Sequence, residues 1–462
     1  MIVMKFGGSS LKDLAAVERV SSIVAARLRR RPVVVVSAMG DTTDTLVSLL
    51  AAVERGDAVE AKRIAAAVAA AYREAARTIG AGAPTDGAGR LEREIAGLER
   101  YVDGMLALGE ASPRSRDAVL AFGEIATAGI FADALCARGI AAAAVDPRDV
   151  IATDSRHGAA TPDEPLTAER AARVIGERLA GGTVPVIGGF VGATVDGVTT
   201  TLGRGGSDLT ASILAALLGA DALEFWKDVD GILTADPRIV EGARPIPILS
   251  FREASELAFL GARVLHPSSI KPAVDAMVPV RVLNSFRPDA PGTSIVRTPR
   301  RDGVRGAAAT SIAHKRDQVL VNIHSTRMLG ATGFLRRVFE VFDRLGISVD
   351  HIATSEVNVT VTIGAQPGID RLAAELSEVA SITVRRGVGV VSAVGEGLSS
   401  VPGAASTVLG ALEGSELQLL TYGGFGVNLS LVVDDGEVEP VVRRLHARIF
   451  GAPLRREEAR CG

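Results

Sequence analysis

Two glycine-rich segments, far apart in the chain, carry charged residues of the types that bind phosphate groups. In the first, Lys5 lies near the end of the apolar run 2–6, and Gly7, Gly8 and Ser9 follow it. Glycines let the backbone approach a phosphate closely, and the helix expected after them offers unpaired N–H groups. The lysine adds a compact positive charge. The segment fits a phosphate site, although it fits an ordinary strand-to-helix turn with a solvated lysine equally well.

The second segment, 202–208, surrounds an arginine with glycines. Arg204 is flanked by Gly203 and Gly205, and Ser207 and Asp208 then open the apolar stretch 209–218. This pattern combines a phosphate cradle with an acidic residue able to cap a helix. Asp208 could serve only as that cap, but Arg204 has no evident structural purpose and suits two-pronged binding of a carboxylate. The sequence therefore favours an anion-binding site here.

Two further features are weaker on their own. Lys227 and Asp228 begin a loop that runs to Arg238, and Asp-Gly and Asp-Pro turns explain several of its residues without any function. Loops after parallel strands nevertheless often bind ligands. Glu124 is a carboxylate at the start of an otherwise apolar helix. It could complement the helix dipole or pair with the ammonium group of a substrate.

Apolar runs bounded by turn residues predict the strands that position these residues. They lie at 2–6, 33–36, 140–145, 184–187, 222–226 and 280–283. Continuous apolar runs are typical of parallel strands covered on both faces. Helical spacing between the runs, first from Leu14 to Leu28, predicts an α/β sandwich for residues 1–297.

The C-terminal third shows a different organisation. Residues 298–316 have the composition of a linker, and a repeat follows in the region 317–462. A shift of 70 residues places the run 319–323 on 389–393 and Gly333 on Gly403. Each copy reads as strand, glycine turn, amphipathic helix, strand, turn and strand. The sequence thus predicts two small α/β modules in tandem.

Composition excludes several classes of protein. The 462 residues are 47 % hydrophobic, with a formal net charge of −3 and only 4 % aromatic residues. Such a chain lacks the basic surface and stacking platforms of a nucleic-acid binder. Cys136, Cys461 and six scattered histidines show no metal-ligand spacing, so no protein-bound metal is expected. No leader and no membrane-spanning run are recognised, which favours a cytoplasmic location.

Taken in order, these motifs resemble the aspartate kinases of the amino acid kinase superfamily. The resemblance rests on the segments 5–10, 200–208, 228–238 and 265–267, and it runs nearly from end to end. It implies an amino acid kinase-type αβα sandwich followed by two ferredoxin-like (βαββαβ) ACT domains, at about 317–385 and 386–456, either consecutive or interleaved. The segments 324–329 and 348–356 resemble the lysine-sensitive, monofunctional type, which implies a homodimer or tetramer formed through the ACT domains.

The resemblance also implies roles for individual residues. Lys5 contacts the transferring phosphoryl group, Asp208 organises the active-site cations, and Mg²⁺ is bound through the nucleotide phosphates. Thr43, Glu124 and Arg204 hold L-aspartate. ATP contacts Lys5, Gly7, Gly8, Ser9, Lys227, Asp228, Leu233, Arg238 and Arg263. Two of these depart from the family pattern: Arg263 stands where lysine is frequent, and Leu233 replaces a frequent tyrosine.

The implied reaction transfers phosphate from ATP to the side-chain carboxylate of L-aspartate, the first step towards lysine, threonine and methionine. A carboxylate is already ionised at neutral pH, so the nucleophile needs no general base. Bringing an anion to a polyanion is the main obstacle. Positioning and positive charge are therefore the expected sources of rate.

For the regulatory half, the resemblance implies an amino-acid effector, lysine, bound by the first ACT copy. The expected effector residues are Met328, Phe334, Ser348, Val349, Asp350, Thr354, Ser355 and Glu356. At the 70-residue shift Asp350 falls on Leu420, which cannot bind an ammonium group. The first copy is therefore expected to hold the effector, unless Asp350 is only a solvated turn residue.

Two alternatives remain open at this point. A glutamate or acetylglutamate kinase would share the glycine motifs, but an acetylated amine has no need of a carboxylate partner such as Glu124. A catalytically silent amino-acid sensor would have no need of Lys5, Arg204 and Asp208.

Overall fold

A computed structural model describes residues 1–79, 87–261, 265–299, 309–396, 398–423 and 426–451. The chain forms two compact units, which are described separately. The first comprises Met1–Ile232, Pro247–Phe251 and Val264–Pro299, and the second comprises Leu233–Ile246, Arg252–Arg263 and Arg300–Gly462. The division differs from the predicted one at 297 because part of the loop after Lys227 belongs to the second unit.

An eight-stranded sheet forms the centre of the first unit. Its order is β3 (Ala142–Val145), β4 (Val184–Gly188), β2 (Pro32–Val36), β1 (Ile2–Phe6), β7 (Ala222–Lys227), β9 (Val280–Asn284), β10 (Thr293–Val296) and β8 (Ile248–Ser250). The first six strands run parallel, and β10 pairs antiparallel to β9. Every residue of β1 and β2 is buried. Five of the six predicted runs lie within one of these strands, and the sixth, 140–145, begins two residues before β3. A separate hairpin pairs β5 (Val191–Ala193) with β6 (Thr199–Thr201).

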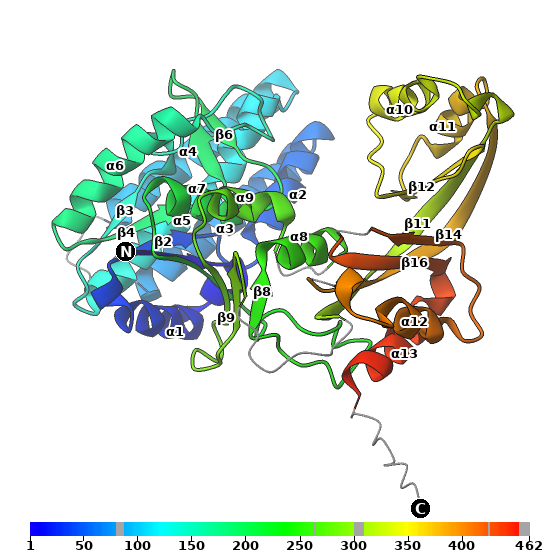
Figure 1. Ribbon diagram of the computed structural model, residues 1–462. Helices are drawn as coiled ribbons and strands as arrows, with labels where there is room; N and C mark the ends of the chain where they lie inside the picture. The colour runs from blue at the N-terminus through cyan, green and yellow to red at the C-terminus, as the bar shows by residue number, and fades with distance from the viewer. Residues whose placement is uncertain (80–86, 262–264, 300–308, 397, 424–425, 452–462) are drawn as a thin grey trace, which may run out of the picture. The chain divides into compact units, whose positions relative to one another are not determined.

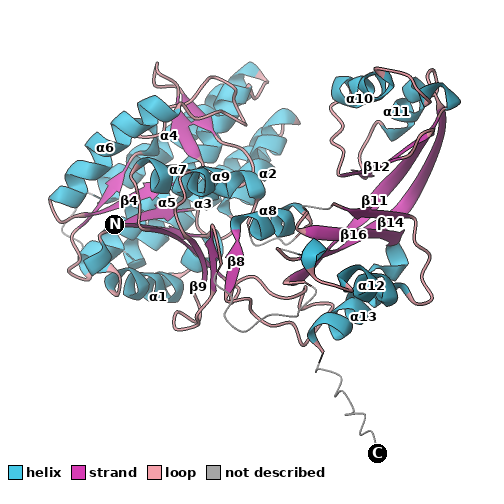
Figure 2. Cartoon of the chain, viewed as in Figure 1, coloured by secondary structure: helices cyan, strands magenta, loops and turns pink. Residues whose placement is uncertain are grey.

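Helices cover both faces of this sheet (Figure 2). One hydrophobic core joins alternate residues of β1 to α1 (Leu14–Ala25), α2 (Thr42–Glu54), α3 (Ala58–Ile79), α4 (Gly87–Leu108) and α5 (Pro113–Ala137). On the other face, α7 (Gly206–Leu217) contacts β1, and α6 (Glu164–Ala180) and α9 (Pro267–Asp275) pack against α7. The predicted αβα sandwich is confirmed.

The helix α5 is the central core helix of this unit. Ser112 caps it by accepting a hydrogen bond from the Ser115 N–H, and Pro113 occupies the first turn. By length and composition α5 could span a membrane, but 89 % of its apolar stretch is buried inside the protein. Its apolar character is therefore explained by packing.

The first helix is shorter than its periodicity predicts. It ends at Ala25, and Leu28 lies in a 3₁₀ turn, half-exposed. Arg31 then adopts a left-handed conformation with φ of 52°. This reversal brings Pro32 to the start of β2 beside β1, so the need to pair β2 with β1 ends the helix.

The second unit contains a six-stranded antiparallel sheet. Its order is β12 (His351–Thr354), β13 (Asn358–Gly364), β11 (Ser311–His324), β14 (Ser381–Val394), β16 (Asn428–Asp434) and β15 (Leu419–Tyr422). Two hydrophobic cores form along it, one under α10 (Phe334–Arg344) and α11 (Ile369–Leu376), the other under α12 (Ala404–Leu409) and α13 (Val438–Phe450). The unit also includes most of α8 (Phe251–Phe259).

The two modules share the long strands β11 and β14 (Figure 1). The register of their pairing shifts between Lys315 and Gln318. Before this bulge, Ile312 packs in the core under α12 and α13, and after it Val319 packs in the core under α10 and α11. The modules are thus interleaved. The predicted linker, 298–316, overlaps β11, which begins at Ser311.

The repeat itself is real but contains compensating length changes. Gly333 and Gly403 precede α10 and α12 with the same φ of 78°. The Asp350 N–H donates to the Thr362 carbonyl, whereas in the second copy the Gln418 N–H donates to the Val432 carbonyl. Gln418, not Leu420, is therefore the counterpart of Asp350. The ungapped comparison was wrong because the loop before the last strand spans 355–357 in the first copy and 423–427 in the second.

Candidate active site

A cavity of about 540 Å³ opens in the first unit, beyond the carboxyl ends of β1, β2 and β4. This is the edge at which parallel sheets bind ligands. Its lining includes six residues predicted from the sequence: Lys5, Gly8, Thr43, Glu124, Arg204 and Asp208. Gly203, Gly205, Gly206 and Ser207, from the predicted glycine segment 202–208, also line it. The other lining residues are Ser37, Ala38, Gly40, Val47, Leu120, Gly158, Phe190 and Thr201.

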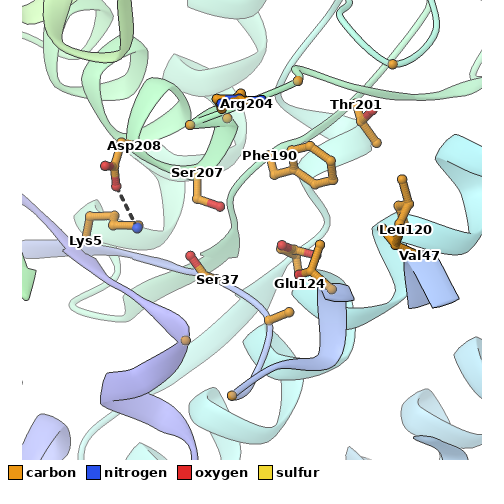
Figure 3. A pocket seen from close by; sticks show the side chains of 18 residues that line it. Lys5, Ser37, Val47, Leu120, Glu124, Phe190, Thr201, Arg204, Ser207 and Asp208 are labelled. Carbon is orange, nitrogen blue, oxygen red and sulfur yellow. Dashed lines mark ion pairs between the residues drawn. The ribbon is translucent and has the colours of Figure 1, made fainter. Parts of the chain in front are cut away.

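The two glycine-rich segments meet through a carboxylate held by two lysines. Lys5 Nζ lies 2.6 Å from Asp208 Oδ1, and Lys227 Nζ lies 3.0 Å from Asp208 Oδ2 (Figure 3). Residues 2, 4 and 6 of β1 face the α1–α5 core, so strand alternation turns Lys5 towards α7, whose first turn carries Asp208. Lys5 and Asp208, to which the family resemblance assigns roles in one reaction, are thus in contact.

The charge balance of this group favours an anion. Burial alone would raise the pKa of Asp208, but the charges and hydrogen bonds of Lys5 and Lys227 outweigh it and lower the pKa to about 2. Burial lowers the pKa of Lys227, and Asp208 opposes that effect. With Asp208 ionised, two ammonium groups share one carboxylate. The surplus positive charge lies at the cavity wall, next to the N-terminus of α7.

Glu124, in contrast to the lysines, can supply negative charge to the cavity. Its side chain is 3 % exposed, and its Oε2 atom has no hydrogen-bond partner among the described residues. Burial raises the pKa of Glu124 to about 8, against the opposing effects of the nearby backbone and Lys5. Figure 3 shows Glu124 and Lys5 facing the same space from α5 and β1. A buried carboxyl with one unpaired oxygen can receive a positively charged group.

Glycines allow the arginine loop to approach the sheet. Gly203 and Gly205 adopt left-handed φ values of 76° and 72°. A side chain on Gly189, after β4, would come within 2.6 Å of the Ser207 Cα. Arg204 itself is exposed and lines the cavity between these glycines. The turn thus holds a guanidinium group at the mouth of the cavity, on the wall formed by the start of α7.

The structure does not bring every predicted site residue to this cavity. Ser9 is exposed, and Gly7 and Asp228 lie outside the lining, while Lys227 is connected to it through Asp208. Leu233 and Arg238 belong to the second unit, where Arg238 pairs with Asp236 at 2.6 Å. Arg263 lies outside the described residues. The nucleotide-binding roles of these residues stay predictions.

Some lining residues that the sequence analysis missed had a usable signal. Ser37 is the first polar residue after the buried strand β2, which is a common ligand-binding position in parallel sheets. Thr201 lies in the motif 200–208, whereas Gly158 had no signal, because it reaches the cavity only through contacts between distant segments.

The predicted effector residues separate into three groups in the first ACT module. Phe334 is buried in the core under α10, with Met328 and Val349 packed against that core. Asp350 is paired, its Oδ2 atom lying 2.8 Å from Lys315 Nζ. The remaining four are exposed: Ser348, Thr354, Ser355 and Glu356. Their role in effector binding stays a prediction.

Comparison with known families agrees with this architecture. A sequence model described as the amino acid kinase family matches residues 1–284, and a model of the ACT domain matches residues 391–449. The fold is thus that of an amino acid kinase joined to ACT modules.

Full-length relatives narrow the class. Lysine-sensitive aspartokinase 3 of Escherichia coli is 36 % identical and covers 97 % of this chain and 99 % of its own length. Chloroplastic aspartokinase 3 of Arabidopsis thaliana is also 36 % identical, over 97 % of this chain and 81 % of its own. The solved structure of Escherichia coli aspartokinase III with aspartate and ADP superposes with a TM-score of 0.82 at 34 % identity, covering 97 % of this chain and 100 % of the other. The chain therefore belongs to the aspartokinases, the members of the amino acid kinase family that phosphorylate aspartate, and the resemblance found in the sequence is confirmed.

Proposed function

We propose that this chain transfers the γ-phosphoryl group of ATP to the side-chain carboxylate of L-aspartate in the cavity of the first unit, and that L-lysine inhibits the reaction through the ACT modules. The observation that carries the catalytic proposal is that one cavity contains both positively charged groups and a buried carboxyl group. Lys5 and Lys227 present surplus positive charge, and Glu124 presents a buried carboxyl whose Oε2 atom has no hydrogen-bond partner among the described residues.

Each end of aspartate has a matching group. Glu124 receives the α-ammonium group, and Arg204 binds the α-carboxylate by paired hydrogen bonds. The side-chain carboxylate then points towards Lys5. An acetylated amine would leave Glu124 without a cationic partner, which disfavours an acetylglutamate kinase. Substrate binding also shifts the titration of Glu124, because a bound ammonium group favours the ionised form.

The phosphates of ATP are met by Lys5, Lys227 and the N–H groups at the start of α7. Asp208 keeps both lysines in place, since each of its oxygens already faces one ammonium group. A Mg²⁺ ion at Asp208 would have to displace a lysine, so the arrangement fits an ion carried by the nucleotide phosphates. Such an ion supplies charge neutralisation between the phosphates when it is bound.

The reaction follows from these positions. A side-chain carboxylate oxygen of aspartate attacks the γ-phosphorus, the bond to the β–γ bridging oxygen breaks, and ADP leaves. The nucleophile is ionised, so no proton has to be removed. Lys5 stabilises the negative charge of the transferring group, and the cavity holds two anions at reacting distance.

The test is an assay of ATP consumption with L-aspartate, in which hydroxylamine traps the acyl phosphate product. Lys5→Ala is expected to lower turnover at least about 1000-fold, because a buried charge at the transferring group is lost. Circular dichroism checks that the variant folds. Near-normal turnover of Lys5→Ala would contradict the assigned role. Equal activity with L-glutamate or N-acetyl-L-glutamate would contradict the substrate.

Lysine as effector is supported by a second solved structure. Escherichia coli aspartokinase III with lysine and aspartate superposes with a TM-score of 0.76 at 34 % identity. Asp350 is the residue in the first module suited to an effector ammonium group. Titration with lysine, threonine and both together tests the proposal, and an enzyme with no response to lysine would end it.

A further inference from the structure

A second carboxylate on α5 has no part in the proposed mechanism. Asp117 lies seven residues before Glu124, which is two helical turns, so both side chains point to the same side of the helix. Its side chain is only 1 % exposed, and it lies outside the cavity lining. A buried aspartate needs compensating hydrogen bonds. The partners of Asp117 therefore indicate which parts of the fold this residue holds together.

The hydrogen-bond partners of Asp117 in the described part of the chain all lie outside α5, in the segments of Gly158 and Thr201. The Thr201 hydroxyl donates to Oδ1 at 2.6 Å, and the Gly158 N–H lies 3.1 Å from both carboxylate oxygens. The Nδ1 atom of His157 lies 2.8 Å from Oδ2, where a ring N–H donates. Gly158 and Thr201 both line the cavity. One buried carboxylate therefore connects α5 to two separate lining segments.

These two segments also hold the arginine loop. The Ala160 N–H donates to the Thr201 carbonyl at 2.9 Å, which ties the segment of Gly158 to β6. Thr201 ends β6, and the turn with Arg204 begins two residues later. A side chain on Gly203 would lie 3.1 Å from the Gly158 carbonyl oxygen. The segments of Gly158, Thr201 and Arg204 thus pack against one another and form one wall of the cavity. The hydrogen bonds of Asp117 connect this wall to α5, the helix that carries Glu124.

We propose that Asp117 is a positioning residue that fixes the separation between Glu124 and Arg204, and through it the length of amino acid that the cavity accepts. The inference rests on the proposed function, in which Glu124 and Arg204 hold the two charged ends of the α-amino acid. The remaining carboxylate reaches the phosphoryl group only when both ends are held at the right spacing. L-Glutamate is longer by one methylene, so its carboxylate is misplaced while the wall stays fixed.

The test is Asp117→Asn in the full-length chain. Asparagine replaces one acceptor oxygen by an NH₂ donor, which then faces the donors of Gly158 or His157. We expect KM for L-aspartate to rise about 10- to 100-fold, as for a displacement of about 1 Å near the reacting groups. KM for ATP stays within about twofold, since the lysines and Asp208 are untouched. The preference for L-aspartate over L-glutamate in kcat/KM falls.

Asp133→Asn is the matched control. Asp133 is also a buried aspartate of α5 and pairs with Arg90 at 3.5 Å, away from the cavity. The control is expected to leave both KM values and the substrate preference unchanged. If Asp117→Asn and Asp133→Asn lower Tm alike and neither changes KM for L-aspartate, the role of Asp117 is structural and the inference is wrong. The inference is equally wrong if Asp117→Asn raises both KM values in parallel.

A second variant decides the case if Asp117→Asn does not fold. Thr201→Val keeps the side-chain shape and removes one donor to Asp117. It is expected to raise KM for L-aspartate about threefold to tenfold with KM for ATP unchanged, and an unchanged KM for L-aspartate overturns the inference. The unaltered chain is assayed first. Absence of aspartate-dependent ATP consumption there refutes the proposed function itself, which is a different result from a failure of the variants.

Discussion

Two carboxylates in this molecule are expected to receive an ammonium group, and their surroundings are opposite. Glu124 in the catalytic cavity is buried, with one oxygen lacking a hydrogen-bond partner in the described part of the chain. Asp350 in the first ACT module is already paired with Lys315 at 2.8 Å. The Lys315 ammonium group also lies 4.0 Å from the centre of the Phe259 ring. One oxygen of Glu124 is thus open to a cation, whereas Asp350 already has a cationic partner.

The two carboxylates should differ in their affinity for an arriving ammonium group. At Glu124 an arriving ammonium group pairs with an oxygen that has no other hydrogen-bond partner in the described structure. At Asp350 an arriving ammonium group exchanges places with Lys315, so only the difference between two similar interactions is gained. The substrate site is therefore prepared for tight charge pairing, while the effector site is set for a weaker, graded response.

Among the tests of this comparison, the substitution of Glu124 has the largest expected effect. Glu124→Gln keeps the shape of the side chain but removes the charge that pairs with the substrate ammonium group. We expect KM for L-aspartate to rise about 100-fold, in line with about 2–3 kcal/mol for a hydrogen bond to a charged group. KM for ATP is the internal control and should stay unchanged. A KM for L-aspartate within a factor of two of the parent value would show that the open carboxyl does not bind substrate.

The second largest expected effect is the pH dependence of L-aspartate binding, which follows from the titration of Glu124. Its pKa is raised to about 8 by burial, so the carboxyl of the free enzyme is mostly protonated at pH 7. Only the ionised form pairs with an ammonium group. Affinity for L-aspartate should therefore rise with pH up to about 8 and fall up to tenfold for each unit below it. Calorimetry in buffers of different ionisation enthalpy measures the released proton, and Glu124→Gln should abolish the release. A flat affinity between pH 6 and 8 would contradict the assignment.

Some parts of the structure could be predicted from local sequence patterns. Continuous valine runs identified β2 and its neighbours because parallel strands covered on both faces leave no polar positions. The contact of Lys5 with Asp208 agrees with the family resemblance, which assigned both residues to one reaction. Local patterns, read against a known family, were sufficient for both.

Other features depend on contacts between distant segments and have no local signal. Asp117 looks like any polar residue at the start of a helix until Gly158 and Thr201 are folded against it. The partner of Asp350 is 35 residues away, across the bulge of β11. The comparison of Asp350 with Leu420 failed because it allowed no gaps. The second copy has a longer loop before its last strand and is shorter before that hairpin, so the residues between are out of register.

Lys315 offers the sharpest test on the regulatory side. Lys315→Met removes the competing ammonium group and keeps the apolar stem, which leaves Asp350 free for an effector. The lysine concentration that gives half-maximal inhibition should fall about tenfold, whereas Lys315→Arg should keep it close to that of the parent. Asp350→Ala should lose the response to lysine altogether. If Lys315→Met raised that concentration instead, Lys315 would assist effector binding rather than compete with it.

The smallest expected effect is at Phe259, which separates the two contacts of Lys315. Phe259→Leu keeps an apolar side chain of similar bulk on α8 but removes the ring that attracts the ammonium group. The half-exposed setting of Phe259 limits this interaction to about 0.5–1 kcal/mol. Lys315 then holds Asp350 less firmly, so half-maximal inhibition by lysine should occur at a concentration about two to five times lower. In the background of Lys315→Met the same substitution should have no effect, because the two residues act through one contact. Additive effects of the two substitutions would show that Phe259 influences the effector site by another route.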